Sequence, residues 1–514
     1  MPVKTFAAID VGSYVIAMKI FEVSQKHGMR EIDHIRYGID MGTETYATGK
    51  LGYERVEELC RILREYREIM KGYKVEEYQA YATSAIRESD NTVILLDQIK
   101  MRTGIEIEVL SNSAQRFLHY KAAAWMEVGF EAIIDQATAI VDIGGGSIQV
   151  SLFDQDTLVS TQNLRLGVLR LQEHLNHLDV LPSHYEEMIF EIVDAQMASY
   201  KKLFLRDKEV VNIIVVDDYI SDIVRKRKDK GLGKGGIDKS VVEDFLKVFR
   251  TNHFSDLAQM LDIPTDNMKP LLISGVLLWN IIQTMGAQVI WTPGASLCDG
   301  IAYEYAEGNR IISPRHDFEQ DIIACAQNIS KRYRGSKRRG ENLEMLATTI
   351  FDSIKKVHGL GKRERLMLRL AALLHDCGKY ISMINSGECA YSIIMATEII
   401  GLSHREREMV ANVVKYAYRE FEYYETLGCH QDIDQPSYLV IAKLTAILRV
   451  AAGLDRSHRQ KCRELKAVLK DDQLMLTVDT TESITLEQGL FDLRTGFFEE
   501  VFSIRPVLRR KRAY

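Results

Sequence analysis

Residues 137–149 read ATAIVDIGGGSIQ, and the apolar segment VSLFD follows directly. Two apolar runs separated by three glycines predict two strands joined by a glycine-rich turn. Because glycine has no Cβ, the backbone N–H groups of such a turn can approach an anion closely. Asp142 stands at the end of the first strand, where a carboxylate can hold a metal ion through water or position a nucleophilic water.

The same pattern occurs about 130 residues earlier, where residues 4–23 hold two β-branched apolar runs around the segment Asp10-Val11-Gly12-Ser13. The repeat predicts two related α/β halves that face each other. Periodicity completes these halves with further elements. Helices are expected at residues 52–70, 91–103 and 113–126, and strands at 75–83, 105–111, 213–216 and 288–291.

The composition is typical of a multidomain globular protein. The chain has 514 residues, a formal net charge of −6, 46% hydrophobic residues and 27% charged residues, which excludes a disordered, collagen-like or coiled-coil chain. Its longest apolar stretch, residues 271–282, is shorter than the ~20 residues that span a bilayer, and its first residues do not read as a signal peptide. The seven cysteines form no CxxC pair, so reduced thiols and a cytoplasmic location are expected.

The chain changes character after a polar break at residues 308–316. Helical periodicity follows in residues 343–358, 364–375, 391–400 and 403–418. From Glu464 onward short alternating strands return, with a hairpin turn predicted at residues 470–473. We therefore expect four parts: two α/β halves, a helical domain and a small α/β tail, at residues 1–128, 129–308, 316–460 and 461–514.

Three basic clusters interrupt this mildly acidic chain. They read RKRKDKGLGK at residues 225–234, KRYRGSKRR at 331–339 and RRKRAY at 509–514. Such clusters can bind a polyanion locally. Each can instead be an ordinary solvated loop or tail, which is the more frequent explanation for any single cluster. The sequence leaves both interpretations open.

Several motifs, taken in order, carry a resemblance to a known family. They read IDVGSYVIAMKIFEV from residue 9, YATSAIRESDN from residue 81, VDIGGGSIQVSLFD from residue 141 and LRLGVLRL from residue 164. Together they resemble the exopolyphosphatase/guanosine pentaphosphate phosphatase (Ppx/GppA) family, which has the duplicated actin-like, or ribonuclease H-like, ATPase fold. HGLGKRERLMLRLAALLHDCGKYIS from residue 358 and RVAAGLDRSH from residue 449 resemble the helical HD-type domain of its longer members.

The resemblance implies a phosphate site between the two glycine turns. Asp10 and Asp142 would also hold a divalent cation, Mg²⁺ or Mn²⁺, that bridges phosphate oxygens. Arg87 matches a family arginine expected to contact a phosphate through its guanidinium fork. The implied phosphate-binding residues are Asp10, Gly12, Ser13, Asp142, Gly144, Gly145, Gly146 and Ser147.

Two carboxylates of the family pattern are amides in this chain. Where the family has Ser-Gly-x-Glu-Glu-Ala, residues 111–116 read SNSAQR, so the catalytic Glu corresponds to Gln115. Where the family has Gly-Gly-Gly-Ser-Thr-Glu, the last position is Gln149. A Gln cannot accept a proton as a general base, although some phosphoryl-transfer enzymes orient the water with a Gln. Gln115, Gln149 and Arg87 remain the catalytic candidates.

Two further segments depart from the family pattern. Asp217 and Asp218 replace a glycine-rich phosphate loop of the second half, and acids there would repel an anion. In the helical domain, Arg339 stands where HD enzymes have their first His. His375 and Asp376 are therefore expected to be a structural remnant, a hydrogen-bonded pair at the end of a helix.

The resemblance implies hydrolysis of a phosphoanhydride by in-line attack of water, with release of terminal phosphate from inorganic polyphosphate or hydrolysis of guanosine pentaphosphate. The missing carboxylates leave a second hypothesis open, a catalytically weakened sensor that binds polyphosphate or a nucleotide. A third hypothesis is an ATP-binding protein or kinase of the wider fold. The expected partners are polyphosphate or guanosine polyphosphate and, as is common in the family, a second copy of the chain. Neither a membrane nor nucleic acid is expected.

Overall fold

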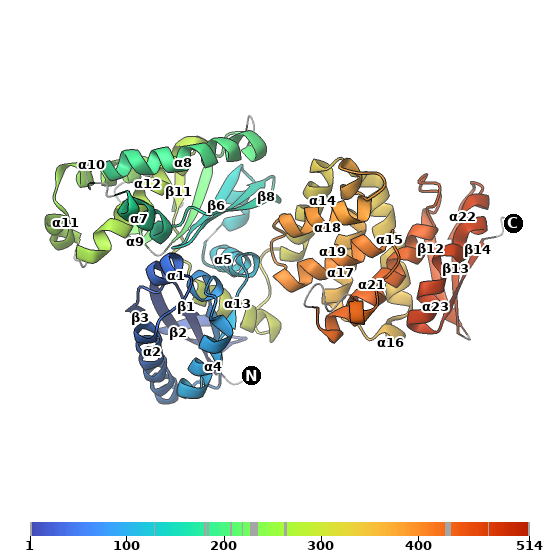
Figure 1. Cartoon of the computed structure of the whole chain (residues 1–514), viewed down its shortest axis with the longest axis horizontal. Helices are drawn as coiled ribbons and strands as arrows, with labels where there is room; N and C mark the ends of the chain where they lie inside the picture. Colours follow the sequence, from blue (N-terminus) through green and yellow to red (C-terminus); the bar gives the residue numbers. More distant parts are fainter. Residues whose placement is uncertain are drawn as a thin grey trace. The chain divides into compact units, whose positions relative to one another are not determined.

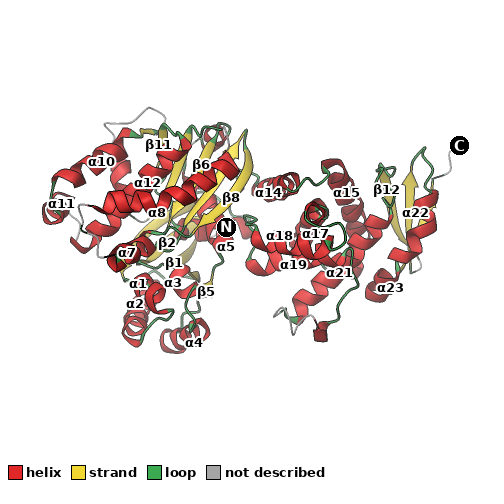
Figure 2. Cartoon of the chain, turned by 45° about the horizontal axis from the view of Figure 1, so that its top comes forward, coloured by secondary structure: helices red, strands yellow, loops and turns green. Residues whose placement is uncertain are grey.

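The computed structural model describes residues 3–127, 129–178, 181, 184–205, 208–217, 219–226, 235–261, 265–426, 433–470 and 472–511. The chain divides into two compact units, Met1–Phe318 and Glu319–Tyr514. The first unit contains two sheets with helices packed on them, and the second contains a helical bundle followed by a small sheet (Figures 1 and 2). Residues 227–234 and 512–514, which hold much of two basic clusters, lie outside the described residues.

The first sheet has five strands in the order β3-β2-β1-β4-β5. The first three strands form an antiparallel meander, and the last two run parallel to β1. Their bounds are β1 (Lys4–Val11), β2 (Val15–Ser24), β3 (Gly28–Gly38), β4 (Glu77–Ala82) and β5 (Glu108–Val109). Alternate residues of β1 point into two separate cores, so this central strand is covered on both faces.

Different helices supply those two cores. Ala7 and Ile9 pack with α2 (Tyr53–Gly72) and α4 (Thr92–Thr103). Phe6 and Ala8 pack with α5 (Asn112–Met126) and α13 (Leu297–Gly308). The remaining helices of this half are short: α1 (Gly42–Thr48), α3 (Ser84–Arg87) and, after α5, α6 (Phe130–Ile134).

The second sheet repeats the arrangement of the first. Its order is β10-β11-β9-β6-β7-β8, with an antiparallel meander from β6 to β8 and with β9 and β11 parallel to β6. The six strands are β6 (Thr138–Ile143), β7 (Ile148–Asp154), β8 (Thr157–Leu164), β9 (Asn212–Asp217), β10 (Ile237–Asp238) and β11 (Val289–Trp291). The predicted duplicated actin-like fold is confirmed, because β6 to β9 follow the same order and direction as β1 to β4.

Helices of the second half pack their apolar faces on β6 and β7. Ala139, Val141 and Ile143 lie in one large core with these helices, which are visible in Figure 1. Their bounds are α7 (Val168–His177), α8 (Tyr185–Tyr200), a π-helical turn η2 (Lys201–Leu205), α9 (Ser221–Lys226), α10 (Ser240–Thr251), α11 (Phe254–Leu261), the 3₁₀ turn η4 (Thr265–Asn267) and α12 (Met268–Met285).

Helix α13 returns to the first half of the unit. It contacts α5, β1 and β2, although the expected boundaries assign residues 297–308 to the second half. The contact is a backbone approach, because a Cβ at Gly300 would lie 2.2 Å from the carbonyl oxygen of Leu118. No real Cβ fits at that distance, so glycine at this position allows α13 to lie directly against α5.

Substitution of Gly300 tests this packing. Gly300→Ala is expected to lower the free energy of unfolding by about 1–3 kcal/mol or more, because α13 and α5 must move apart. Gly308→Ala, at the end of the same helix and with nothing within 4 Å of its added Cβ, is the matched control. Urea denaturation of the two variants measures the effect, and equal midpoints would contradict the close contact.

The second unit is a helical bundle that ends in a three-stranded sheet. The helices are α14 (Phe318–Arg332), α15 (Lys337–Ser353), α16 (Lys355–His358), α17 (Lys362–Leu374), η5 (Cys377–Tyr380), α18 (Ser386–Ala396), α19 (His404–Tyr416), α21 (Gln435–Gly453), α22 (Thr485–Leu490), η6 (Phe491–Arg494) and α23 (Gly496–Phe502). The predicted hairpin is formed by β12 (Glu464–Lys470) and β13 (Gln473–Asp479).

The C-terminal basic segment is a strand where the structure describes it. Residues Arg505–Arg510 form β14, which pairs in parallel with β13, and Lys511 is ion-paired with Asp479. Arg509, Arg510 and Lys511 are exposed, so these first residues of the cluster are solvated, but they continue the small α/β unit expected at residues 461–514 instead of forming a free tail. The apolar run Pro506-Val507-Leu508 between arginines is the short apolar segment that could have predicted the strand.

One helix of the described residues, α21 (Gln435–Gly453), is long and apolar enough to cross a membrane by length and composition alone. Most of its apolar window, 61%, is buried inside the structure. A core helix of a globular protein passes the same test, so this finding is weak evidence for a membrane span.

Candidate active site

Two turns of the same geometry face each other in the first unit. In each, the glycine that follows the strand, Gly12 or Gly144, donates its N–H to the carbonyl three residues later at 3.0 Å. The turns touch, because a Cβ built on Gly145 would lie 3.3 Å from the Cβ of Ser13. A side chain at Gly145, the second of the three glycines, would therefore crowd the place where the turns meet.

The Ser13 hydroxyl joins a buried polar network. Its Oγ lies 2.8 Å from the Oγ of Ser84 and 3.0 Å from the hydroxyl of Tyr46, and it accepts the Ala85 N–H at 3.1 Å. Burial raises the pKa of Tyr46, which therefore stays a neutral hydroxyl near pH 7. The network fixes α1 and α3 against the first turn.

Helix α7 fixes the second turn. The Val168 N–H donates to the carbonyl of Gly144 at 3.0 Å, and a Cβ at Gly167 would lie 2.2 Å from the carbonyl oxygen of Gly145. The motif LRLGVLRL thus requires its glycine for a backbone contact. Farther along α7, Arg170 forms an ion pair with Glu88 at 2.7 Å, which links the two halves across the site.

A cavity of about 50 Å³ lies between the turns. The predicted residues Asp10, Gly12, Ser13, Gln115, Asp142, Gly144 and Gly145 line it. Of the residues that the structure describes, the lining does not include Arg87, Gly146, Ser147 or Gln149. The structure thus brings most of the predicted phosphate-binding residues together and places the others beside the cavity.

Arg87 and Gln115 contact each other next to this cavity. The Arg87 Nη1 donates to the carbonyl of Leu110 at 2.7 Å and to the Oε1 of Gln115 at 3.4 Å. The arginine at the end of α3 therefore holds the amide of Gln115 near the start of α5. In this arrangement the guanidinium is half-buried and close to the cavity without lining it.

Gln149 is held by an arginine that the sequence analysis did not single out. The Nε of Arg116 donates to the Oε1 of Gln149 at 2.8 Å, and its Nη1 donates to Thr161. Both Arg116 and Gln149 are 3% exposed. Position 116 is the Ala of the family motif Ser-Gly-x-Glu-Glu-Ala, so the Arg and the Gln are two departures that meet in one hydrogen bond.

His119 is a second residue that the sequence analysis missed. It lies on α5 four residues after Gln115, on the same helix face, and it lines the cavity. Its Nδ1 is 2.5 Å from the Oδ2 of Asp142, and the two side chains are 12% and 8% exposed. A histidine one turn after the expected catalytic position was the feature that could have revealed it.

The carboxylate of Asp217 is hydrogen-bonded to groups close to it in the structure. Its carboxylate accepts the N–H groups of Tyr219, Ile220 and Ser221 at 3.2, 3.1 and 2.7 Å, and the hydroxyl of Ser274 at 2.6 Å. These donors offset the charge that was expected to repel an anion, because each one neutralises part of it. Asp218 lies outside the described residues.

The side chains fit a divalent cation only in part. Among the described residues, no group of three or more His, Cys, Asp or Glu side chains is placed to hold a metal ion. One oxygen of Asp142 is engaged by His119, whereas Asp10 lines both this cavity and its neighbour. Mg²⁺ commonly takes one or two carboxylates and completes its shell with phosphate oxygens and water, so Asp10 is the carboxylate that suits it here.

A second cavity of about 330 Å³ adjoins the first and shares Asp10 and Asp217 with it. Lys19, at 4% exposure, lines this space and is held at 2.9 Å by both Glu31 and Asp299. Burial by itself would lower the pKa of Lys19, but the two carboxylates outweigh it and the pKa is raised. The side chain therefore remains a cation in this cavity.

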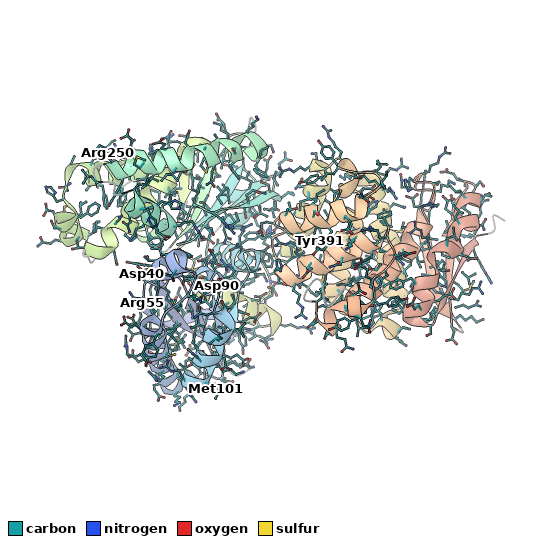
Figure 3. All side chains as sticks on the ribbon, viewed as in Figure 1. Asp40, Arg55, Asp90, Met101, Arg250 and Tyr391 are labelled. Carbon is teal, nitrogen blue, oxygen red and sulfur yellow. The ribbon has the colours of Figure 1, made fainter. Side chains whose placement is uncertain are left out.

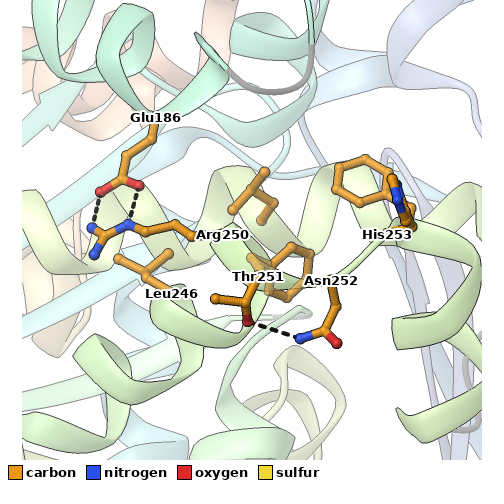
Figure 4. Close-up of a pocket in the computed structure, with 9 residues that line it drawn as sticks. Glu186, Leu246, Arg250, Thr251, Asn252 and His253 are labelled. Atoms are coloured by element: carbon orange, nitrogen blue, oxygen red, sulfur yellow. Dashed lines mark hydrogen bonds and ion pairs between the residues drawn. The ribbon is translucent and has the colours of Figure 1, made fainter.

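A larger cavity of about 570 Å³ lies among α8, α10, α11 and α12 (Figure 4). None of the predicted site residues is among those that line it. Its arginine, Arg250 on α10 (Figure 3), is bound by Glu186 through its Nε at 2.8 Å. We therefore do not assign the predicted phosphate binding to this cavity.

The HD remnant in the second unit is a buried ion-pair cluster. The Nη1 of Arg339 donates to both oxygens of Asp376 at 2.9 Å, and its Nη2 lies 2.9 Å from the Nε2 of His458. Burial would raise the pKa of Asp376, but His375, Lys379 and Arg339 outweigh it and hold the pKa well below its usual range. The sequence led us to expect a solvated or polyanion-binding cluster at residues 331–339. Arg339 does not belong to such a cluster, because it is only 7% exposed.

His375 lies at the end of α17, as predicted. Its Nδ1 is 2.6 Å from the carbonyl of Ala372, and its Nε2 is 3.2 Å from Asp376. Among the described residues, His375 therefore contacts the end of α17, and Asp376 contacts Arg339.

Comparison with known proteins agrees with this geometry. The model of the Ppx/GppA phosphatase family matches residues 19–250, and that of Ppx/GppA phosphatase domain III matches residues 323–493. The chain belongs to the Ppx/GppA phosphatase family. The structure is similar to that of an exopolyphosphatase from Cytophaga hutchinsonii, with a TM-score of 0.50 and 16% identity over 60% of this chain and all of the other.

Curated relatives differ in how much of the chain they match. A guanosine-5′-triphosphate,3′-diphosphate pyrophosphatase from Vibrio cholerae is 21% identical over 488 residues, 92% of each chain. Exopolyphosphatase 1 from Mycobacterium bovis is 24% identical over 37% of this chain and 54% of its own. A bifunctional 3-dehydroquinate synthase/phosphatase from Fusobacterium nucleatum is 24% identical over 38% of this chain, and the match spans only 30% of that protein.

The Arg116–Gln149 contact predicts that the two amides respond differently to replacement by Glu. Gln115→Glu puts a carboxylate on the cavity wall and is expected to raise phosphate release by about 10-fold or more, as added general bases do. Gln149→Glu is expected to change release by less than about 3-fold, because the new carboxylate forms a buried ion pair with Arg116 and cannot act on water. Phosphate release from polyphosphate by each variant is the measurement, and a larger gain from Gln149→Glu would contradict the assignment.

The ion-pair cluster of the second unit predicts a stability effect. Arg339→Ala is expected to destabilise the protein by about 3–5 kcal/mol, because it leaves the Asp376 carboxylate buried without its guanidinium. Arg338→Ala, one residue earlier and exposed, is the matched control and should unfold like the parent. Thermal unfolding of the full chain followed by circular dichroism compares them, and equal curves for both variants would refute a buried ion pair.

Proposed function

We propose that this chain hydrolyses a phosphoanhydride, releasing terminal phosphate from inorganic polyphosphate or hydrolysing guanosine pentaphosphate. The observation that carries the proposal is the pair of facing glycine turns, with Asp10, Ser13 and Asp142 around one cavity. The Vibrio cholerae relative, similar over 92% of each chain, is named for hydrolysis of a guanosine polyphosphate, and the partly matching mycobacterial relative is named an exopolyphosphatase. A cytoplasmic location belongs to the same proposal.

The chain's own groups suit a transferring phosphoryl group. Phosphoryl transfer depends mainly on positioning and on stabilisation of charge, and glycine turns supply backbone N–H groups at close range. Arg87, which already contacts Gln115, can swing its guanidinium from the Leu110 carbonyl to a phosphate oxygen. Gln115 orients the attacking water through its amide. A divalent cation, Mg²⁺ or Mn²⁺, held by Asp10 would add neutralisation of the phosphate charge.

The small volume of the cavity indicates how substrate enters. About 50 Å³ exceeds the ~10–15 Å³ that one water needs but leaves little room for a chain of phosphates. The second cavity, which shares Asp10 with the first and has a volume of about 330 Å³, provides space for the rest of the substrate, although its Lys19 is already paired with Glu31 and Asp299.

The test is phosphate release by the purified chain. With Mg²⁺ or Mn²⁺ present, the chain should release phosphate from polyphosphate or guanosine pentaphosphate, and Arg87→Ala should reduce the rate by about 10²-fold because a charge-stabilising donor is lost. Arg61→Ala, on the outside of α2 at 53% side-chain exposure, should keep the parent rate.

Calorimetry with the same two substrates separates the hypotheses. Binding together with turnover supports the hydrolase. Tight binding without any phosphate release would replace it with a sensor, and absence of both binding and release would overturn the proposed site.

A further inference from the structure

The sheet near the C-terminus of the chain, β12-β13-β14 (Figure 1), has one buried face and one open face. Leu474, Leu476 and Val478 of β13 are at most 2% exposed, so their face packs against the rest of the second unit. Alternate residues of a strand point to opposite faces. The residues between these three, and their partners on the neighbouring strands, therefore form the open face, whose side chains are exposed or half-buried.

Strand pairing arranges the open face in rows of three side chains. Across β12, β13 and β14 the rows are Lys470-Gln473-Arg505, Val468-Met475-Val507 and Lys466-Thr477-Arg509. Each of the two outer rows has an exposed cation on both edge strands, and the row between them is apolar. The backbones of the two cations in one row lie about 10 Å apart, since they are separated by two strand spacings of ~4.8 Å.

Acidic side chains neutralise little of this charge. Among the described residues, Arg505 is the one of the four cations that forms an ion pair, and its Nε is 3.9 Å from Glu499. Glu464 and Asp479 lie together beyond the last of these rows, where Lys511 pairs with Asp479. The three rows therefore present positive charge to a polyanion.

A hollow of about 410 Å³ opens at the β14 edge of this face, beside Arg505 and Val507. Its walls also include the amides of Gln473 and Gln488 and the carboxylate of Asp492. Amides and a carboxylate together offer hydrogen-bond donors and acceptors, which are the groups that recognise the edge of an unpaired base. The volume lies within the range of ~300–1,000 Å³ that is usual for ligand pockets.

We propose that this open face binds single-stranded nucleic acid. Phosphates contact the two cation rows, which fix the position of the strand, while bases cover the apolar row and one base enters the hollow. The thioether of Met475 suits this role, because sulfur makes favourable contacts with aromatic rings. The sequence did not predict such a site, since its cations come from two separate segments that form one surface only when β14 pairs with β13.

Other partners suit the face less well. Inorganic polyphosphate would satisfy the cations, but it has no part that would cover the apolar row or use the amides of the hollow. A second copy of the same face would bring like charges together, which is unfavourable at an interface. A bilayer would require protruding apolar side chains, whereas Met475 and Val507 are half-buried between longer cationic side chains.

The salt dependence of binding tests the cation rows. The probe is a fluorescent single-stranded oligouridylate of about 12 nucleotides, within the site sizes of small binding domains, and its anisotropy reports binding to the full chain. Each phosphate contact contributes about −0.7 to the slope of log K against log salt. Lys466→Ala/Lys470→Ala/Arg509→Ala is therefore expected to make the slope shallower by about 2 and to weaken binding about 10-fold at physiological salt.

A matched triple variant and a variant of the apolar row complete the experiment. Lys355→Ala/Lys356→Ala/Lys362→Ala removes three exposed cations from the helical part of the same unit and should bind like the parent. Met475→Ser should weaken binding by about 2- to 10-fold, the range of one sulfur–aromatic contact, without changing the slope. Circular dichroism checks that each variant folds.

The same titration with inorganic polyphosphate of about 12 phosphates, a similar charge, decides the class of ligand. Weaker binding of polyphosphate than of the oligouridylate supports the inference. Absence of oligouridylate binding by the parent chain overturns it, and so does a triple variant of the face that binds like the parent. Polyphosphate that binds at least as tightly through the same three cations also overturns it. None of these results depends on the proposed hydrolysis, which phosphate release measures separately.

Discussion

The backbone contact between α13 and α5 determines where the site can form. Gly300 lets the two helices approach until a Cβ would lie 2.2 Å from the Leu118 carbonyl. Leu118 is the neighbour of His119 and follows Gln115 and Arg116 on the same helix, so this contact places three site residues at once. The glycine turns supply the two sides of the cavity, and α5 supplies the wall between them.

In each of the two units, a buried arginine donates hydrogen bonds to a polar side chain at a position that departs from the family pattern. In the first unit, Arg116 holds the amide of Gln149, which stands where the family has a Glu. In the second unit, Arg339 stands where an HD enzyme has its first His and holds the carboxylate of Asp376. A guanidinium offers five donors in a fixed plane, so one arginine satisfies several polar atoms in each of these buried clusters.

Much of the fold was predictable because its pattern is strong. The two glycine turns repeat with the same order of strands, and hydrophobic periodicity located the helices α2, α4 and α5. The sequence could not show that α13 returns to the first half, since that depends on one close backbone contact. It also missed β14, because six residues rich in arginine read as a tail until a partner strand is known.

The site was predictable only where the turns define it. Sequence order brings Asp10, Ser13, Asp142 and Gly145 together, because the two turns end equivalent strands. His119 and Arg116 escaped notice for a different reason: each acquires its role from a residue far along the chain, Asp142 or Gln149. Contacts between residues so far apart in the chain produce no periodic pattern in the sequence, so only the three-dimensional structure shows them.

The positions of these pairs also explain how the site can lose two carboxylates and still support hydrolysis. Loss of a proton acceptor costs about 10²–10⁴-fold in rate, whereas the stabilisation of phosphoryl charge, which is the larger contribution in this chemistry, is assigned by our proposal to backbone donors and Arg87. Those donors are retained. Replacement of Glu by Gln removes negative charge next to the phosphates, which favours binding of a polyanion.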